Sequence, residues 1–182
     1  MIENIQDARI NTAGAYVRLH GLYVFAIGIQ PHNGRIPVVR LGGHRKENET
    51  SWQCAVREAL EEANLQIKAL LPQTTYLWGW DQLETEPQGI QWQQDPAPFL
   101  VVTYRRGEQT TLSLMYLAQT EDIPMPSSEV KGLLLLEEAE IHHLCREPVT
   151  LKQYLQTGGK AILQDEFDHH RILEPFAQLR LL

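Results

Sequence analysis

Three glutamates, Glu58, Glu61 and Glu62, are the residues of this sequence whose types and spacing best suit chemistry. In a helix, residues three or four positions apart lie on the same face, so we expect the three carboxylates to point the same way. Like charges this close repel each other, and a bound cation relieves that repulsion. Mg²⁺ and Mn²⁺ prefer oxygen ligands of this kind. The spacing therefore predicts a divalent-metal site, against the alternative of a solvated acidic helix face.

A helix over residues 51–63 is predicted to carry these carboxylates. Thr50 suits the N-cap, and Gln53 three positions later completes a capping box. Asn64 suits a left-handed C-cap at the other end. At about 100° per residue, the side chains expected to pack on a sheet fall opposite the glutamates; they are Val56, Ala59, Leu60 and Ala63.

Residues on either side of the glutamates are expected to complete the site. Arg57 is next to Glu58 in sequence, and we expect it to pair with Glu49 or Glu61 and fix its orientation. Gly42 and Gly43 precede the helix, and glycine lets the backbone approach a ligand closely.

The window from Gly43 to Leu65 resembles the Nudix box of the Nudix hydrolases, written G-x5-E-x7-R-E-U-x-E-E-x-G-U with U apolar. Each fixed position fits except the final glycine, which is Asn64 here. The resemblance implies an α/β fold, a Nudix-type α/β/α sandwich with a mixed β-sheet. It also implies metal-dependent hydrolysis of a pyrophosphate bond in a nucleoside diphosphate linked to another group X.

The resemblance also implies roles for single residues. Glu61 and Glu62 correspond to the ligands of Mg²⁺ (or Mn²⁺), together with the carbonyl oxygen of Gly43. Glu58 is either a further ligand or the general base, and Glu49 is an outer ligand or helper.

Some family members place the base on a later loop. Glu129 is our candidate for that role here, with Glu121 and Asp122 behind it. The alternative for Glu129 is a surface charge where a strand begins.

Markers of substrate class are missing downstream of the box. Known subfamilies carry a proline or a tyrosine at positions that Trp80, Asp81 and Gln82 occupy here. Trp78 and Trp80 alternate with Tyr76 along a predicted strand and either stack a base or form an aromatic core patch. Arginine suits phosphate groups, so Arg40 and Arg105 are candidate substrate-binding residues, with His44 and Arg45 as weaker ones.

The pattern along the chain predicts more strands than helices. Strands are expected within residues 16–30, 36–41, 66–71, 75–80 and 132–136, and a hairpin from 99–105 and 110–118. Short helices are expected at 137–145 and 150–156. Residues up to about Ala15 are expected to be an extension or edge element, and residues 163–182 a strand followed by a short helix near Pro175. We interpret residues 1–182 as one domain with a short N-terminal extension and a C-terminal helical tail.

Composition limits the class of partner. A net charge of −7 argues against a nucleic-acid surface, and no apolar run approaches the ~18 residues of a membrane span. Cys54 and Cys145 form no metal or disulfide motif, which favours a cytoplasmic protein. The segment 165–170 lacks regular ligand spacing, so a surface loop or a subunit contact is expected there.

Three functions stay open at this point. The first is a Nudix hydrolase acting on a small nucleotide-type substrate. The second is a non-catalytic Nudix module that binds a nucleotide or sugar nucleotide, which the three intact glutamates disfavour. The third is a non-hydrolytic relative such as an isoprenoid isomerase. The apolar tail RILEPFAQLRLL makes a homodimer possible, although the tail can equally pack on its own core.

Overall fold

The computed structural model describes residues 8–28, 34–82, 85–107, 109–127, 130–164 and 167–182. Its elements up to the middle of the chain are β1 (Arg9–Leu19), β2 (Leu22–Ile27), β3 (Ile36–Val39), β4 (Leu41–His44), α1 (Ser51–Ala63), β5 (Lys68–Leu70), β6 (Thr75–Gly79), the 3₁₀ helix η2 (Trp80–Gln82) and β7 (Gln88–Ile90). The remaining elements are β8 (Leu100–Arg106), β9 (Gln109–Gln119), β10 (Gly132–Leu136), α2 (Glu138–Arg146), β11 (Val149–Thr150), α3 (Leu151–Gln156), β12 (Lys160–Leu163), β13 (Ile172–Pro175) and the 3₁₀ helix η3 (Ala177–Leu181). The helix predicted over residues 51–63 is α1, and the predicted hairpin is formed by β8 and β9.

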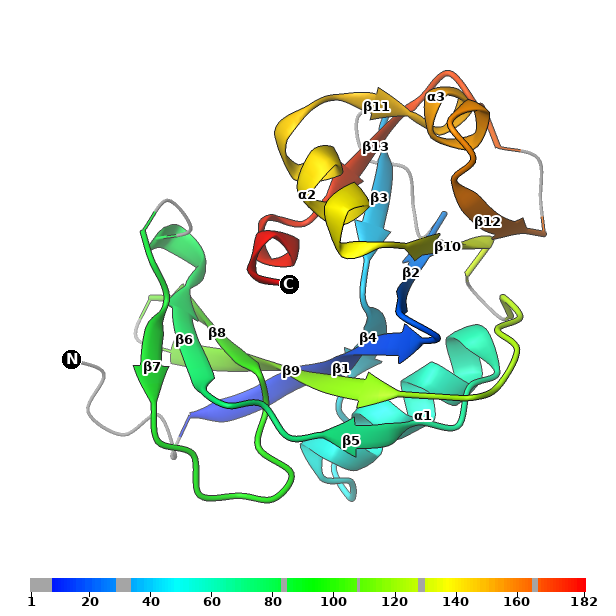
Figure 1. Ribbon diagram of the computed structural model, residues 1–182. Helices are drawn as coiled ribbons and strands as arrows, with labels where there is room; N and C mark the ends of the chain where they lie inside the picture. The colour runs from blue at the N-terminus through cyan, green and yellow to red at the C-terminus, as the bar shows by residue number, and fades with distance from the viewer. Residues whose placement is uncertain (1–7, 29–33, 83–84, 108, 128–129, 165–166) are drawn as a thin grey trace.

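Strand β1 is central and joins the two parts of the sheet (Figure 1). Its first half pairs antiparallel with β4, its second half pairs antiparallel with β2, and its other edge runs parallel to β9. The expectation of an extension or edge element up to about Ala15 is therefore wrong for residues 9–15. Small residues such as Ala13 and Ala15 are fully buried there, because partners far along the chain cover both edges and one face.

The strands form one mixed, hydrogen-bonded sheet across the described ranges. Its main path runs β11-β13-β3-β2-β1-β9-β8-β6-β7, and β4, β5, β10 and β12 branch from it. Most neighbours are antiparallel, whereas β1 with β9, β6 with β8, and β3 with β13 are parallel. The predicted mixed sheet is confirmed.

Helices cover both faces of the sheet (Figure 1). Helix α1 packs on β1 and β4, and α2 packs on β10, β13 and η3. Along β1, side chains alternate between two cores, as strand geometry requires: Ala13, Ala15 and Val17 join the core under α1, and Tyr16 joins the core under α2. The α/β fold class with a helical layer on each face is confirmed.

The apolar C-terminal tail packs on the core of its own chain. Strand β13 pairs parallel with β3, and Leu173 and Leu179 are each 1% exposed. The predicted strand and following short helix correspond to β13 and η3, and the helix is a 3₁₀ turn. No helix in the described part of the chain is long and apolar enough to cross a membrane.

Candidate active site

Helix α1 has the two caps that its sequence predicts. The Thr50 side chain accepts a hydrogen bond from the Gln53 N–H, and the Gln53 side chain accepts one from the Thr50 N–H. Asn64 adopts a left-handed conformation with φ of 55°, and its N–H donates to the Ala59 and Leu60 carbonyls. Both ends of the helix that carries the glutamates are therefore fixed by short-range hydrogen bonds.

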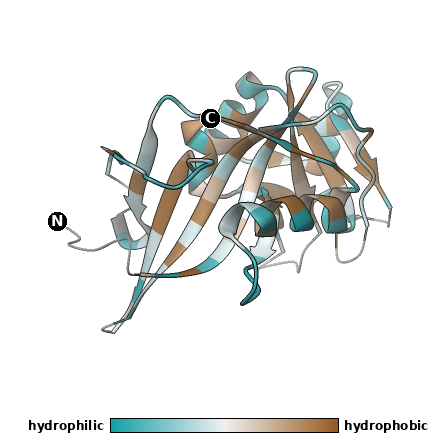
Figure 2. Ribbon diagram, turned by 90° about the horizontal axis from the view of Figure 1, so that it is seen from below, coloured by the Kyte–Doolittle hydropathy of each residue, from teal (hydrophilic) through white to brown (hydrophobic). Residues whose placement is uncertain are grey.

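The buried stripe of α1 lies beside the glutamates and not opposite them. Its fully buried members are Cys54, Ala55, Ala59 and Ala63, whereas Leu60 is 49% exposed. The expectation that Leu60 packs on the sheet is therefore wrong. Small side chains let α1 lie close across the strands (Figure 2), and this closeness brings Glu58 and Glu62 to the backbone of β4.

Arg57 joins three of the carboxylates. Its Nε and Nη2 atoms donate to both oxygens of Glu49 at 3.0 and 2.8 Å, and its Nη1 donates to Glu58 at 2.7 Å and to Glu61 at 2.9 Å. Nη2 also donates to the His44 carbonyl at 3.0 Å. The predicted pairing with Glu49 or Glu61 is confirmed for both residues, and the contact with Glu58 is additional.

This ion-pair network shifts the pKa values of its members. The side chains of Arg57 and Glu49 are 20% and 13% exposed. Hydrogen bonds from Arg57 lower the pKa of Glu49 from 4.5 to about 2, although burial opposes this shift. The same bonds, that to Glu49 first, raise the pKa of Arg57. Both groups are charged at neutral pH, and charge-assisted bonds hold their geometry.

Two glycines bring the β4 backbone against the helix. The Gly42 N–H donates to Glu62 Oε2 at 2.8 Å. A methyl group added at Gly43 would lie 2.5 Å from Glu58 Oε1, so the Glu58 carboxylate lies directly against this residue. The Cys54 thiol donates to the Gly43 carbonyl at 3.7 Å, and burial raises its pKa to about 11. Cys54 is therefore a protonated packing residue at neutral pH.

The loop after β9 is attached to the C-terminal end of α1. The N–H groups of Met125 and Ser127 donate to the carbonyls of Ala63 and Glu62 at 2.9 and 3.0 Å, and the Ser127 hydroxyl donates to the Glu61 carbonyl. These bonds satisfy carbonyls that the helix end leaves without partners. Glu129, the candidate base, lies outside the described residues.

The donor set of this site suits a hard divalent cation. Carboxylate oxygens come from four glutamates: Glu49, Glu58, Glu61 and Glu62. The positive charges beside them are Arg57 and Lys46, and the Lys46 ammonium lies 3.9 Å from Glu61. Negative charges thus outnumber positive ones by four to two among these groups. In the ranges that the structure describes, no three His, Cys, Asp or Glu side chains are already arranged around a metal position, and Glu58 and Glu61 bond to Arg57 instead.

A cavity of about 280 Å³ adjoins the carboxylate site at Gly42. Its wall includes Arg40, Tyr104, Ser113, Phe176 and Gln178. Arg40 Nη2 donates to Ser113 Oγ at 3.2 Å. A side chain on Gly14 or Gly42 would collide with Arg40 Nη1, so the guanidinium lies over these two glycines. Arg40, which the sequence singled out, thus lines the cavity beside Gly42, whose N–H bonds to Glu62.

The aromatic and basic candidates separate into different environments. Trp78 is 2% exposed, and Arg180 covers its ring at 4.6 Å, so Trp78 belongs to the core and offers no face to a base. Trp80 is 44% exposed and stacks on Tyr104 at 5.0 Å. Arg105 is exposed on β8 and does not line the cavity.

Two other basic candidates have structural surroundings. Arg45 donates to the backbone carbonyls of Ile10 and Glu49 at 3.3 and 2.7 Å, which holds the segment before α1, and His44 is exposed. In the segment 165–170, Asp168 bonds to Arg171 at 3.4 Å and to the His170 N–H at 3.1 Å.

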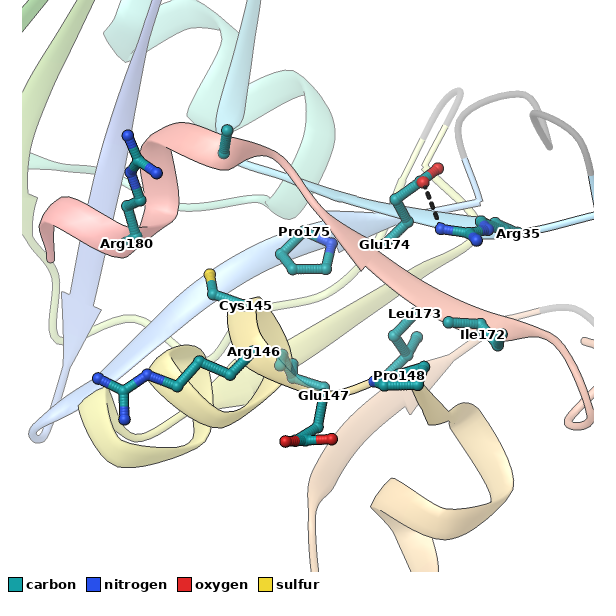
Figure 3. Close-up of a pocket in the computed structure, with 12 residues that line it drawn as sticks. Arg35, Cys145, Arg146, Glu147, Pro148, Ile172, Leu173, Glu174, Pro175 and Arg180 are labelled. Atoms are coloured by element: carbon teal, nitrogen blue, oxygen red, sulfur yellow. Dashed lines mark hydrogen bonds and ion pairs between the residues drawn. The ribbon is translucent and has the colours of Figure 1, made fainter. Parts of the chain in front are cut away.

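A second cavity of about 410 Å³ lies between α2 and the C-terminal strand (Figure 3). Arg35 and Glu174 form an ion pair of 2.8 Å at its edge. Arg146 and Glu147 point away from each other (Figure 3). Its charged groups do not converge on a shared point (Figure 3).

Comparison with known families identifies the class of protein. The family model for the NUDIX domain matches residues 28–156, which is most of the chain. The chain therefore belongs to the Nudix family of hydrolases. Comparison with curated proteins gives no match.

Solved structures of similar fold include a NUDIX-family hydrolase from Clostridium perfringens, with 18% identity, 73% of this chain and 83% of that chain covered, and a TM-score of 0.48. A MutT protein from Methanosarcina mazei Go1 has 11% identity, 77% and 85% coverage and a TM-score of 0.49. An Ap4A hydrolase from C. elegans, solved as a binary complex, has 17% identity, 72% and 82% coverage and a TM-score of 0.46. The family assignment rests on the family model and on the site, not on these scores.

Sequence reasoning missed the residues that complete the cavity wall. Ser113 and Tyr104 come from the β8–β9 hairpin, and Gln178 comes from η3. The one sequence signal for Gln178 is that it is a polar residue inside an apolar tail. The sequence holds no signal for Ser113. Both reach the site through strand pairings that connect distant parts of the chain.

Proposed function

We propose that this protein hydrolyses a pyrophosphate bond in a small nucleoside diphosphate linked to a group X, in a reaction that depends on Mg²⁺ or Mn²⁺. One observation supports this proposal above others. The carboxylates of Glu58, Glu61 and Glu62 lie on α1 next to the Gly42–Gly43 backbone, with Arg57 joining two of them. A solvated acidic face needs neither the glycines nor the shared guanidinium.

Four groups would hold the metal in this proposal: the carboxylates of Glu58, Glu61 and Glu62 and the Gly43 carbonyl. When bound, such an ion lowers the pKa of a coordinated water and neutralises charge on phosphoryl oxygens. Arg57 keeps Glu58 and Glu61 in place, because a guanidinium fixes several carboxylate oxygens at once. Glu49 in turn fixes Arg57 through two hydrogen bonds.

The remaining roles concern proton transfer and substrate binding. Glu58 or Glu129 would remove the proton from the attacking water. Ser127, two residues before Glu129, is bonded to Glu61 and Glu62, which supports a role for this loop. Arg40 would bind a phosphate or the adjoining group, and Trp80, which is not in the described lining of the cavity, would stack through its exposed ring on a base or ring that extends beyond it. Arg105 would act only on a substrate that extends beyond the cavity.

A turnover assay tests this function. Phosphate release is measured from a panel of nucleoside diphosphate compounds, with Mg²⁺ or Mn²⁺, for the wild type, Glu61→Gln and Glu138→Gln. Glu61 is 48% exposed, so its amide variant is expected to fold. Glu138 is exposed on α2, across the sheet, and serves as the matched control.

We expect metal-dependent turnover that falls by about 100-fold or more in Glu61→Gln and stays unchanged in Glu138→Gln. If no compound is hydrolysed while one of them still raises the melting temperature, the hydrolase proposal is contradicted. The non-catalytic nucleotide-binding module would then be the better description of this protein.

A further inference from the structure

The cavity at Gly42 has a wall rich in hydrogen-bond donors. Arg40, Ser113 and Gln178 contribute polar groups, and Phe176 and Leu179 contribute apolar ones. Among the residues that the structure describes, those lining the cavity include no carboxylate. A ligand in this cavity therefore meets donors and apolar surface, which suits a flat group that carries hydrogen-bond acceptors.

Gln178 has an unused donor in this wall. The residue is 1% exposed, and its Nε2 atom is buried without a hydrogen-bond partner in the described chain. Buried polar atoms nearly always have partners, and an unsatisfied one destabilises the fold. An amide kept in this state at a cavity wall is explained when a ligand supplies the missing acceptor.

Ser113 adds a second donor toward the same space. Its Oγ accepts hydrogen bonds from the Thr12 hydroxyl at 2.7 Å and from Arg40 Nη2 at 3.2 Å. One hydroxyl of the Thr12–Ser113 pair donates to the other, so the second hydroxyl keeps a proton for a further acceptor, and both residues line the cavity. Ser113 is 2% exposed, so its partner must lie inside the cavity or in the adjoining wall.

The cavity size limits the ligand. Its volume of about 280 Å³ is near the lower end of the ~300–1,000 Å³ range of small-molecule sites. One heterocyclic base fits this space. Because Gly42 belongs to both the cavity wall and the carboxylate site, a base in the cavity has its phosphates directed toward the glutamates.

We infer that Gln178 determines specificity for a nucleotide whose base carries a carbonyl, and not an amino group, at C6 of a purine or C4 of a pyrimidine, with Nε2–H of Gln178 donating to that carbonyl oxygen. This inference rests on the proposed function for its nucleotide and extends it to the class of base. Gln178 lies beyond residues 28–156, so the specificity comes from a tail outside the matched Nudix domain. A base with an amino group at the same position places a donor against a donor, which is unfavourable.

Binding of matched monophosphates tests this inference. Inosine and adenosine 5′-monophosphate differ by a carbonyl against an amino group on the purine, and uridine and cytidine 5′-monophosphate differ likewise on the pyrimidine. Dissociation constants are measured by calorimetry in one Mg²⁺ buffer for the wild type, Gln178→Met and Gln156→Met. Methionine keeps the length of glutamine without its hydrogen-bonding group. Gln156 is exposed at the end of α3 and is the control.

The expected result is a preference of about tenfold or more for the carbonyl member of at least one pair. Gln178→Met should abolish this preference without lowering the melting temperature, because it removes an unsatisfied buried amide. Gln156→Met should keep the preference. A residue with a merely structural role would instead lower the melting temperature on substitution and leave the preference intact.

Three results would overturn the inference: no binding of any of the four nucleotides, equal affinity within both pairs, or a preference that survives in Gln178→Met. Monophosphates contain no pyrophosphate bond, so this test does not depend on hydrolysis. If the wild type hydrolyses none of the compounds in the turnover panel but still prefers the carbonyl nucleotides, the proposed function is contradicted and this inference stands. If it hydrolyses a compound but shows no carbonyl preference, this inference is contradicted and the proposed function stands.

Discussion

Arg57 uses its five N–H groups on five oxygen contacts, four to carboxylates and one to the His44 carbonyl. Lysine has the same charge but cannot reproduce this planar arrangement. The guanidinium therefore does more than reduce repulsion among the glutamates. It fixes the directions in which Glu49, Glu58 and Glu61 point, and a metal site depends on those directions.

The Glu49–Arg57 pair predicts how stability depends on pH. The pKa of Glu49 is lowered by folding from 4.5 to about 2, so the pair stabilises the folded state fully above pH ~4.5 and loses this effect as the pH falls toward 2. Urea unfolding of the wild type and Glu49→Gln should give a constant difference in unfolding free energy between pH 5 and 7. The difference should shrink at pH 3. A difference that is the same at pH 3 and pH 7 would show that ionisation of Glu49 is not its source.

At the scale of elements, β4 and α1 meet through Gly42 and Gly43, and the two glycines serve different purposes. Gly42 has φ of +152°, a conformation that other residues rarely adopt. A methyl group there would lie 2.5 Å from Gly14 Cα and 2.6 Å from the Ala13 carbonyl. At Gly43, the three atoms nearest to an added methyl group all belong to the Glu58 carboxylate, which is the end of a flexible side chain.

We therefore predict opposite outcomes for two similar substitutions. Gly42→Ala should lower the free energy of unfolding by about 1–3 kcal/mol or more, because backbone must move. Gly43→Ala should change it by less than about 0.5 kcal/mol while reducing turnover strongly, since Glu58 is displaced. Urea unfolding and the turnover assay measure both effects. Full activity in a folded Gly43→Ala variant would argue against Glu58 as a metal ligand or base.

At the scale of the whole molecule, the C-terminal tail joins the sheet and closes the cavity. Strand β13 pairs with β3, and η3 then places Leu179 in the core under α2 and Gln178 at the cavity wall. The same 3₁₀ helix therefore both packs on the core, through Leu179, and forms part of the cavity wall, through Gln178.

This arrangement predicts a large effect for Leu179→Ala. Leu179 is 1% exposed, and removal of a buried leucine side chain costs about 2–5 kcal/mol. Leu71 is 72% exposed, so Leu71→Ala should stay within about 0.5 kcal/mol of the wild type. Urea unfolding at pH 7 compares the three proteins. Equal stability of the two variants would mean that η3 does not pack on the core in solution.

The sequence by itself determined the features that depend on near neighbours. The limits of α1, its Thr50 cap and the Asn64 C-cap follow from contacts within a few residues, and the helix period placed Glu58, Glu61 and Glu62 on one face. The β8–β9 hairpin is likewise local. These are the parts that a short stretch of chain can form with its own hydrogen bonds.

Only the tertiary structure decided the features that depend on distant partners. Residues 9–15 form a central strand because β4 and β9 lie beside them, and Leu60 is exposed because α1 turns its small side chains to the sheet. Trp78 is buried because it lies within strand β6, and Trp80 is exposed because β6 ends at Gly79 before it. Gln178 reaches the cavity across more than a hundred residues of chain. Burial is set by what packs against a residue, and its neighbours in sequence do not contain that information.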